Sequence, residues 1–234
     1  MIDREPAVAG RFYAADRERL AADVARLLGG DGLAPRPAVG VLAPHAGYVY
    51  SGRVAGATYA RVEVPPRAIV LAPNHTGLGA RCALWPDGAF RTPLGRVAID
   101  AALTAAIAAC ALVEEDRTAH LHEHALEVQL PFLQTRRPGV AIAALCLGRL
   151  SADECEALGR AVAKAAREVG ALIVASSDMS HYEPAQRARE HDLAALEPFL
   201  ALDARGLHAR VHREDISMCG VIPATVMLAA AAEL

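Results

Sequence analysis

The sequence lacks the short motifs that mark several large classes of enzyme. It contains no Gly-x-Gly-x-x-Gly run, no Walker-type phosphate loop, no Gly-x-Ser-x-Gly and no His-Glu-x-x-His. These absences disfavour nucleotide-dependent chemistry and the common active sites of serine hydrolases and zincins.

Hydrophobic runs, charge and cysteines give further information on the binding partners and the cellular compartment to expect. No apolar run approaches the roughly 20 residues that cross a bilayer. The net charge of -3 gives no reason to expect nucleic acid or an anionic membrane as a partner. The five cysteines are odd in number and show no zinc-ribbon spacing, which is typical of reduced thiols. The first residues are charged and do not resemble a leader, so we expect a cytoplasmic protein.

The 234 residues are 53% hydrophobic, so the chain can bury a substantial core. Runs typical of strands alternate with runs typical of helices, which favours βαβ units. We expect strands at 39–43, 68–72, 140–147 and 171–175, a hairpin within 82–100, and helices at 15–28, 51–59, 100–110, 123–134, 151–169, 184–200, 203–211 and 220–232. The sequence therefore predicts one α/β domain over residues 1–234, with a largely parallel sheet and helices on both faces.

Polar side chains follow three of these expected strands. Two strands end in Ala-Pro and are followed by His45 and His75, each beside a glycine, and a third ends before Asp178 and His181. The carboxyl ends of parallel strands line the crevice in which open α/β sheets bind ligands. Two or more histidines in that crevice indicate a metal site.

His45 alone fits two roles equally well, a metal ligand or a histidine that bonds its own loop. The matching position of His75 favours the ligand role for both. Cys219 precedes an expected helix, where the helix dipole and the free N–H groups favour the thiolate form that binds metals. A buried, inert thiol is the alternative for Cys219, and it is the role we assign to the other four cysteines, 82, 110, 146 and 155.

Asp178 and His181 are suited to a general acid/base pair or to support of metal ligands, and a network that caps the next helix is the alternative. His124 and Glu127 would share one face of the expected helix 123–134, a spacing that also suits a metal. We expect His191, His208 and His212 to be surface residues.

The chain resembles the Memo family, also called AmmeMemoRadiSam system protein B. The resemblance extends over nearly the whole length and rests on six ordered segments: 4–13 (REPAVAGRFY), 43–48 (APHAGY) with Ser51-Gly52, 73–77 (PNHTG), 123–131 (EHALEVQLP), 176–182 (SSDMSHY) and Cys219-Gly220. The family usually continues past the cysteine-bearing helix into a final strand, and we expect this chain to lack that strand.

The resemblance implies the fold of the class III extradiol (LigB-type) dioxygenases, with cysteine in place of their glutamate ligand. It implies that His45, His75 and Cys219 bind a metal, with Fe(II) first and copper as another candidate. The thiolate ligand itself also suits zinc. Asp178, His181 and His124 match further site residues of the family. The family label also implies partner proteins, a radical S-adenosylmethionine protein and an AMMECR-type protein.

The first functional hypothesis is a non-haem iron oxidoreductase acting on an unidentified small molecule. In it a His/His/Cys set holds the iron, His181 oriented by Asp178 moves a proton, and His124 shapes the pocket. The second hypothesis is a non-catalytic module that binds a metal or a ligand and acts with partner proteins. A third is a cysteine nucleophile, with Cys219 as the thiolate and His181 as its base.

Overall fold

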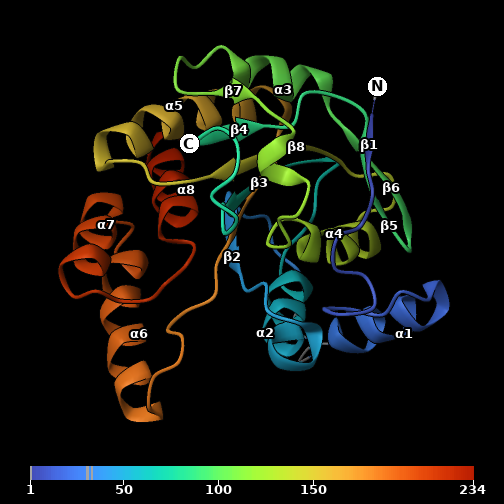
Figure 1. Cartoon of the computed structure of the whole chain (residues 1–234), viewed down its shortest axis with the longest axis horizontal. Helices are drawn as coiled ribbons and strands as arrows, with labels where there is room; N and C mark the ends of the chain where they lie inside the picture. The colour runs from blue at the N-terminus through green and yellow to red at the C-terminus, as the bar shows by residue number, and fades with distance from the viewer. Residues whose placement is uncertain (1, 30–31, 33) are drawn as a thin grey trace.

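The computed structural model describes residues 2–29, 32 and 34–234, and these residues form an α/β fold with a mostly parallel sheet (Figure 1). This confirms the predicted fold class. Along the main path of the sheet the strands are β1 (Asp3–Arg4), β5 (Ala89–Thr92), β6 (Gly95–Ile99), β8 (Ala141–Leu147), β3 (Arg67–Pro73), β9 (Leu172–Ser176) and β2 (Gly40–Ala43). Two short strands lie off this path, β4 (Cys82–Leu84) and β7 (Glu114–Glu115).

The centre of the sheet is parallel. Strand β3 pairs in parallel with β8 on one side and with β9 on the other, and β9 pairs in parallel with β2. The predicted hairpin forms between β5 and β6, whereas β4 adds to β8 in the antiparallel direction. The central strands are buried on both faces, which explains why their sequences are continuous apolar runs without alternation.

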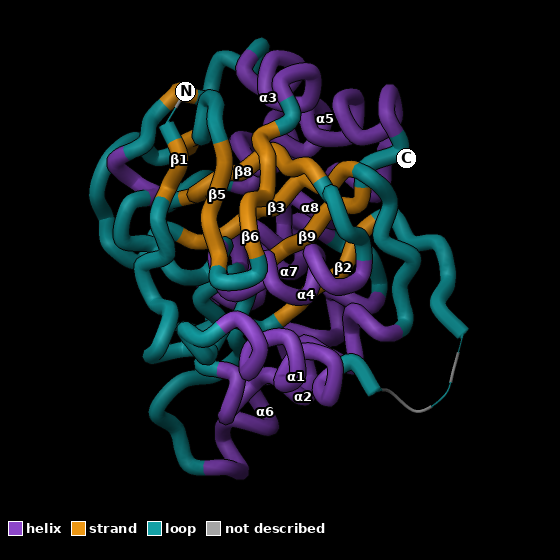
Figure 2. Tube along the Cα trace, turned by 90° about the vertical axis from the view of Figure 1, so that its right-hand side faces the viewer, coloured by secondary structure: helices purple, strands orange, loops and turns teal. Residues whose placement is uncertain are grey.

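Helices cover both faces of the sheet, as Figure 2 shows. One face packs against α3 (Ala101–Ala108), α5 (Ala152–Val169), α7 (Ala204–Arg213) and α8 (Val221–Glu233). The other packs against α1 (Arg17–Leu27), α2 (Tyr48–Ala60) and α4 (Leu130–Arg136). Within β3 the side chains alternate between the two cores, with Ile69 in the first and Val70 in the second.

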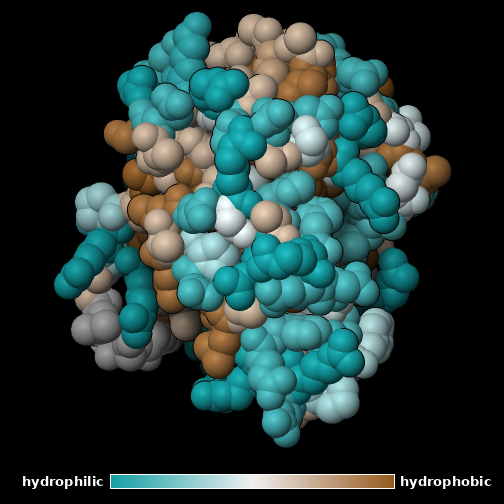
Figure 3. All heavy atoms as spheres, turned by 90° about the vertical axis from the view of Figure 1, so that its left-hand side faces the viewer, coloured by the Kyte–Doolittle hydropathy of each residue, from teal (hydrophilic) through white to brown (hydrophobic). Residues whose placement is uncertain are grey.

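Helix α6 (Ala185–Leu200) packs against α7 and extends from the side of the molecule (Figure 1). The face seen in Figure 3 is mainly hydrophilic, with apolar side chains interspersed. No helix formed by the described residues is long and apolar enough to cross a membrane.

Local capping explains where several helices begin. Asp16 and Asp100 accept hydrogen bonds from the third backbone N–H of α1 and α3. Ser151 and Glu154 form a complete capping box at the start of α5, as the sequence pattern predicts.

Two predicted helix boundaries are wrong. Helix α2 begins at Tyr48 rather than at Ser51, because Gly47 is its N-cap and the Ser51 hydroxyl donates to the carbonyl of Ala46. The helix predicted at 123–134 begins only at Leu130, after a 3-10 turn at Glu127–Gln129. Pro131 lies in its first turn, where the missing N–H has no helical partner to lose, so this proline starts the helix instead of ending it.

Candidate metal centre

Three adjacent strands deliver polar residues to the same edge of the sheet. In the sheet β9 lies between β3 and β2. His45 follows β2, Asp178 follows β9 and His75 follows β3, each within two residues of the end of its strand. The strand order therefore places these three residues at one edge of the sheet, as the sequence pattern predicted.

Cys219 joins two of them. The candidate ligand atoms of His45, His75 and Cys219 all lie within 4.8 Å of one another. The Cys219 Sγ is 3.2 Å from the Nε2 of His45, and the rings of the two histidines are 5.1 Å apart at nearly a right angle. Two imidazoles and a thiolate at such separations suit a divalent iron, copper or zinc ion.

His45 is oriented so that its Nε2 faces this group. Its side chain is buried, its Nδ1 is 2.8 Å from the Ser176 hydroxyl, and its backbone N–H donates to Asp178 Oδ1 over 2.8 Å. Burial lowers the pKa of His45 to about 3, although the nearby Asp178 opposes that shift. The imidazole is therefore neutral at physiological pH, which is the form that binds a metal.

His75 is held by the buried carboxylate of Glu123. The Nδ1 of His75 is 2.9 Å from Glu123 Oε1, and its backbone N–H donates to Oε2 over 2.6 Å. Burial disfavours the cationic ring, but hydrogen bonds to Cys219 and Glu123 and their charges raise the pKa of His75 to about 10. A positive charge is thus favoured between the thiol and the carboxylate. The same surroundings suit a metal cation, with Glu123 orienting the ligand ring as carboxylates do in metal–histidine–carboxylate triads.

Cys219 lies immediately before Gly220, the N-cap of α8, as predicted. The backbone N–H of Asp178 donates to its Sγ over 3.2 Å. The sulfur therefore lies beside a backbone donor and at the N-terminal end of α8.

A second group of possible ligands, His75, Glu123 and His124, adjoins the first. Glu123 is already occupied there, because its Oε1 accepts from the Nδ1 of His75 and from the backbone N–H groups of His124 and Ala125. We therefore interpret this group as a hydrogen-bond network that supports the first site.

His124 is brought to the site, but not by a helix. Its ring stacks on His75 with centroids 4.7 Å apart and contacts Phe12 at 4.8 Å. The predicted helical pairing of His124 with Glu127 is wrong, since His124 lies before the 3-10 turn and Glu127 bonds instead to Arg4 and Tyr13.

Asp178 lies inside the site and His181 lies beside it. Asp178 Oδ2 is 3.9 Å from the Nε2 of His45. His181 is not oriented by Asp178 as expected: its Nδ1 is 2.8 Å from the carbonyl oxygen of Ser217, and its backbone N–H donates to the Ser217 hydroxyl over 2.8 Å. Ser217 is two residues from Cys219, so His181 is attached to the loop that carries the thiol.

The other histidines take no part in the described ligand groups. His212 is exposed, as predicted, but His191 and His208 are half-buried. His191 contacts Glu183 and His208 bonds to the carbonyl of Leu150.

Three of the other four cysteines fit the inert role. All five cysteines are free thiols, and three of the four outside the site, Cys82, Cys146 and Cys155, are buried. Burial raises the pKa of Cys82 and Cys155 to about 12 and that of Cys146 further, which keeps them protonated.

Sequence reasoning missed three supporting residues: Glu123, Ser176 and Gln129. Each lies within or beside a segment that carries a predicted site residue, yet Glu123 and Gln129 were assigned to a regular helix. For Gln129 a signal was present, because it is a polar residue between the buried apolar residues Val128 and Leu130, and a buried polar group requires a partner. Glu123, between two histidines, and Ser176, followed by Ser177, carry no such signal.

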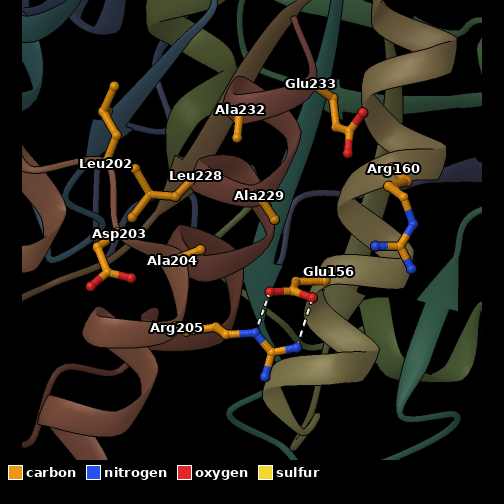
Figure 4. A pocket seen from close by; sticks show the side chains of 10 residues that line it. All are labelled: Glu156, Arg160, Leu202, Asp203, Ala204, Arg205, Leu228, Ala229, Ala232 and Glu233. Carbon is orange, nitrogen blue, oxygen red and sulfur yellow. Dashed lines mark hydrogen bonds and ion pairs between the residues drawn. The ribbon is translucent and has the colours of Figure 1, made fainter.

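A cavity of about 390 Å³ lies at the other end of α8, between that helix, α5 and the start of α7 (Figure 4). Three acidic residues line it, and one of them, Glu156, is paired with Arg205. Leu228 and Ala229 supply apolar wall, and no candidate metal group among the described residues lies there.

A fold with histidines after two strands that flank a third, and a cysteine before a helix, defines an α/β protein with a candidate His/His/Cys metal centre. The sequence pattern of the family described as "Memo-like protein" matches residues 4–234, and the chain belongs to this family.

Three relatives illustrate the match, and each is described as a MEMO1 family protein. The relative from Aquifex aeolicus is 41% identical over 224 residues, which is 95% of this chain and 84% of the relative. The relative from Methanopyrus kandleri is 40% identical over 245 residues, 98% of this chain and 87% of the relative. The relative from Thermotoga neapolitana is 38% identical over 242 residues, 96% and 87% of the two chains.

Proposed function

We propose that His45, His75 and Cys219 bind one Fe(II) ion and that the protein is a non-haem iron oxidoreductase. The observation that carries this proposal is the convergence of two imidazoles and a thiol within 4.8 Å, with the other ring nitrogen of each histidine already bonded to the protein. Iron held by these three residues would supply redox chemistry to a small substrate.

The surrounding residues have separate tasks. Glu123 fixes the ring of His75, and Asp178 holds the loop of His45 through the backbone N–H groups of His45 and Ala46. Asp178 Oδ2, 3.9 Å from the Nε2 of His45, is placed to accept a proton beside the ligand atoms.

His124 and Phe12 shape the neighbouring wall of the site. Their rings are 4.8 Å apart and His124 is partly exposed. His181, whose Nδ1 is bonded to the carbonyl oxygen of Ser217, would exchange protons with a substrate at the edge of the site.

Metal analysis of protein purified without air tests the first part of the proposal. We expect about one iron per chain in the wild type. We expect its loss in Cys219→Ala and His75→Ala, and its retention in His212→Ala, which alters an exposed histidine outside the site. Zinc or copper at the same stoichiometry, lost in the same variants, would keep the site and change the metal.

Oxygen uptake tests the second part. Iron-loaded protein should consume O₂ with a reductant or a phenolic substrate, and His75→Ala should not. Bound iron without any turnover would instead favour a metal-binding module that acts with partner proteins.

A further inference from the structure

The hydroxyl of Ser176 lies at the junction of three hydrogen bonds deep in the protein. Its Oγ is 2.8 Å from His45 Nδ1, 2.8 Å from Gln129 Nε2 and 2.8 Å from the carbonyl oxygen of Ala125. Ser176 and Gln129 are both fully buried, so no bulk water completes the pattern. A serine hydroxyl has one hydrogen and two lone pairs, and where that hydrogen goes determines the state of His45.

Gln129 can only donate to Ser176. Its Nε2 is also 3.0 Å from the carbonyl oxygen of Pro44 and 3.3 Å from that of Ala43, which can only accept, and the contact with Ser176 is the shortest of the three. Its Oε1 accepts from the hydroxyl of Tyr59 over 3.0 Å. These partners fix the orientation of the amide, so an N–H group of Gln129 occupies one lone pair of Ser176.

The carbonyl of Ala125 also can only accept, so the single hydrogen of Ser176 is directed to it. The second lone pair of Ser176 then faces His45, and the Nδ1 of His45 must carry a hydrogen. The opposite arrangement would direct the Ser176 hydrogen to Nδ1 and leave two buried oxygens 2.8 Å apart with no hydrogen between them.

We propose that Ser176, oriented by Gln129, is a positioning residue that sets the Nδ1–H tautomer of His45. The Nε2 of His45 then presents a lone pair toward Cys219 and His75. The role of this tautomer in metal binding rests on the proposed function, but the tautomer itself is set by hydrogen bonds of the metal-free chain. Tyr59, Gln129 and Ser176 form a directed series of donors that runs from α2 to the loop of Ala125.

Nitrogen-15 NMR of the metal-free protein tests the proposal directly, because long-range proton–nitrogen correlations distinguish the two neutral tautomers of histidine. The His45 signals are identified by their loss in His45→Asn. We expect the Nδ1–H pattern in the wild type at neutral pH. An Nε2–H pattern for His45 would overturn the proposal without any further variant.

Two substitutions of Ser176 provide the second test. In Ser176→Ala we expect a mixture of tautomers or the Nε2–H form, and an Fe(II) dissociation constant about 10- to 100-fold higher. Ser176→Thr keeps the hydroxyl and should restore the Nδ1–H pattern. The matched control is Thr104→Ala. It removes a buried hydroxyl of α3 that has no hydrogen-bond partner among the described residues, and it should leave both readouts unchanged.

The outcomes separate this proposal from the metal function. An unchanged Nδ1–H pattern in Ser176→Ala contradicts the role of Ser176, whatever the protein binds. An Nδ1–H pattern that depends on Ser176 supports it even if the wild type binds no iron, and in that case only the proposed function fails.

Discussion

Arg4 and Glu127, 123 residues apart in the chain, form an ion pair that is almost completely excluded from solvent, with Arg4 Nη1 2.6 Å from Glu127 Oε2. Arg4 also donates to the carbonyl oxygens of His120 and Glu123, on either side of the loop that approaches the metal centre. The pair therefore attaches the first strand of the sheet to the loop that carries Glu123 and His124.

Removing one partner of this pair should strongly destabilise the protein. Arg4→Met leaves the Glu127 carboxylate buried without its cation, and we expect the free energy of unfolding to fall by about 3–5 kcal/mol. Denaturant unfolding at pH 7 measures the change. Arg26→Ala breaks an exposed pair with Asp23 and should change the free energy of unfolding by less than about 1 kcal/mol. Equal losses in the two variants would contradict the stronger contribution of the buried pair.

Glu123→Gln should weaken metal binding by more than any loss of folding stability accounts for. The substitution keeps the volume but removes the charge that faces the Nδ1 of His75. We expect an Fe(II) dissociation constant about 10- to 100-fold higher, measured by anaerobic titration. Glu114→Gln, at an exposed position, is the control, and similar affinities in the two variants would show that Glu123 does not act through His75.

Gly220→Ala should displace Cys219. A Cβ at this position would collide with the backbone oxygen of Ser176 and with Ser177, neither of which is the flexible end of a side chain. We expect a loss of about 1–3 kcal/mol of stability and weaker metal binding. Gly148→Ala, where an added Cβ would make ordinary contacts, should leave both unchanged.

The pH dependence of stability should include a contribution from Asp3. Hydrogen bonds to Arg96 and Arg91 lower the pKa of Asp3 from 3.8 to about 2. A lowered pKa in the folded state means that the stabilisation is fully present above pH 3.8 and is lost as the pH falls toward 2. Unfolding measurements of wild type and Asp3→Asn should therefore differ at pH 7 and converge on acidification, and a difference independent of pH would contradict this assignment.

Cys219 should be the thiol that metal protects. Cys82, Cys146 and Cys155 are buried and have raised pKa values, whereas Cys110 and Cys219 are partly exposed, and of these two Cys219 belongs to the candidate metal group. We expect alkylation at Cys219 in metal-free protein, located by mass spectrometry, and a slower reaction after Fe(II) is added. Rapid alkylation that metal does not change would instead favour the cysteine nucleophile.

Several parts of the structure could be predicted because their causes are local. The apolar runs that became β3, β8 and β9 are long enough to identify buried strands, and Ser151 with Glu154 forms the expected capping box. His45 and His75 could be assigned to one crevice because parallel strands present their carboxyl ends together.

The loop that precedes α4 could not be predicted in this way. Residues 123–129 have a pattern compatible with a helix, yet the backbone N–H groups of His124 and Ala125 are satisfied by the carboxylate of Glu123. Tertiary contacts override local propensity here, since Arg4 and Tyr13 approach the same segment from the start of the chain.

The sequence by itself thus determined the α/β class, the family and the ligand candidates His45, His75 and Cys219, because strand patterns and loop motifs are encoded over a few neighbouring residues. Only the tertiary structure decided which nitrogen of each histidine faces the centre. That choice depends on the Ser176 hydroxyl and the Glu123 carboxylate, which lie 131 and 48 residues from the rings that they hold. Such hydrogen bonds exist only after distant segments have packed together and excluded water from the polar groups between them.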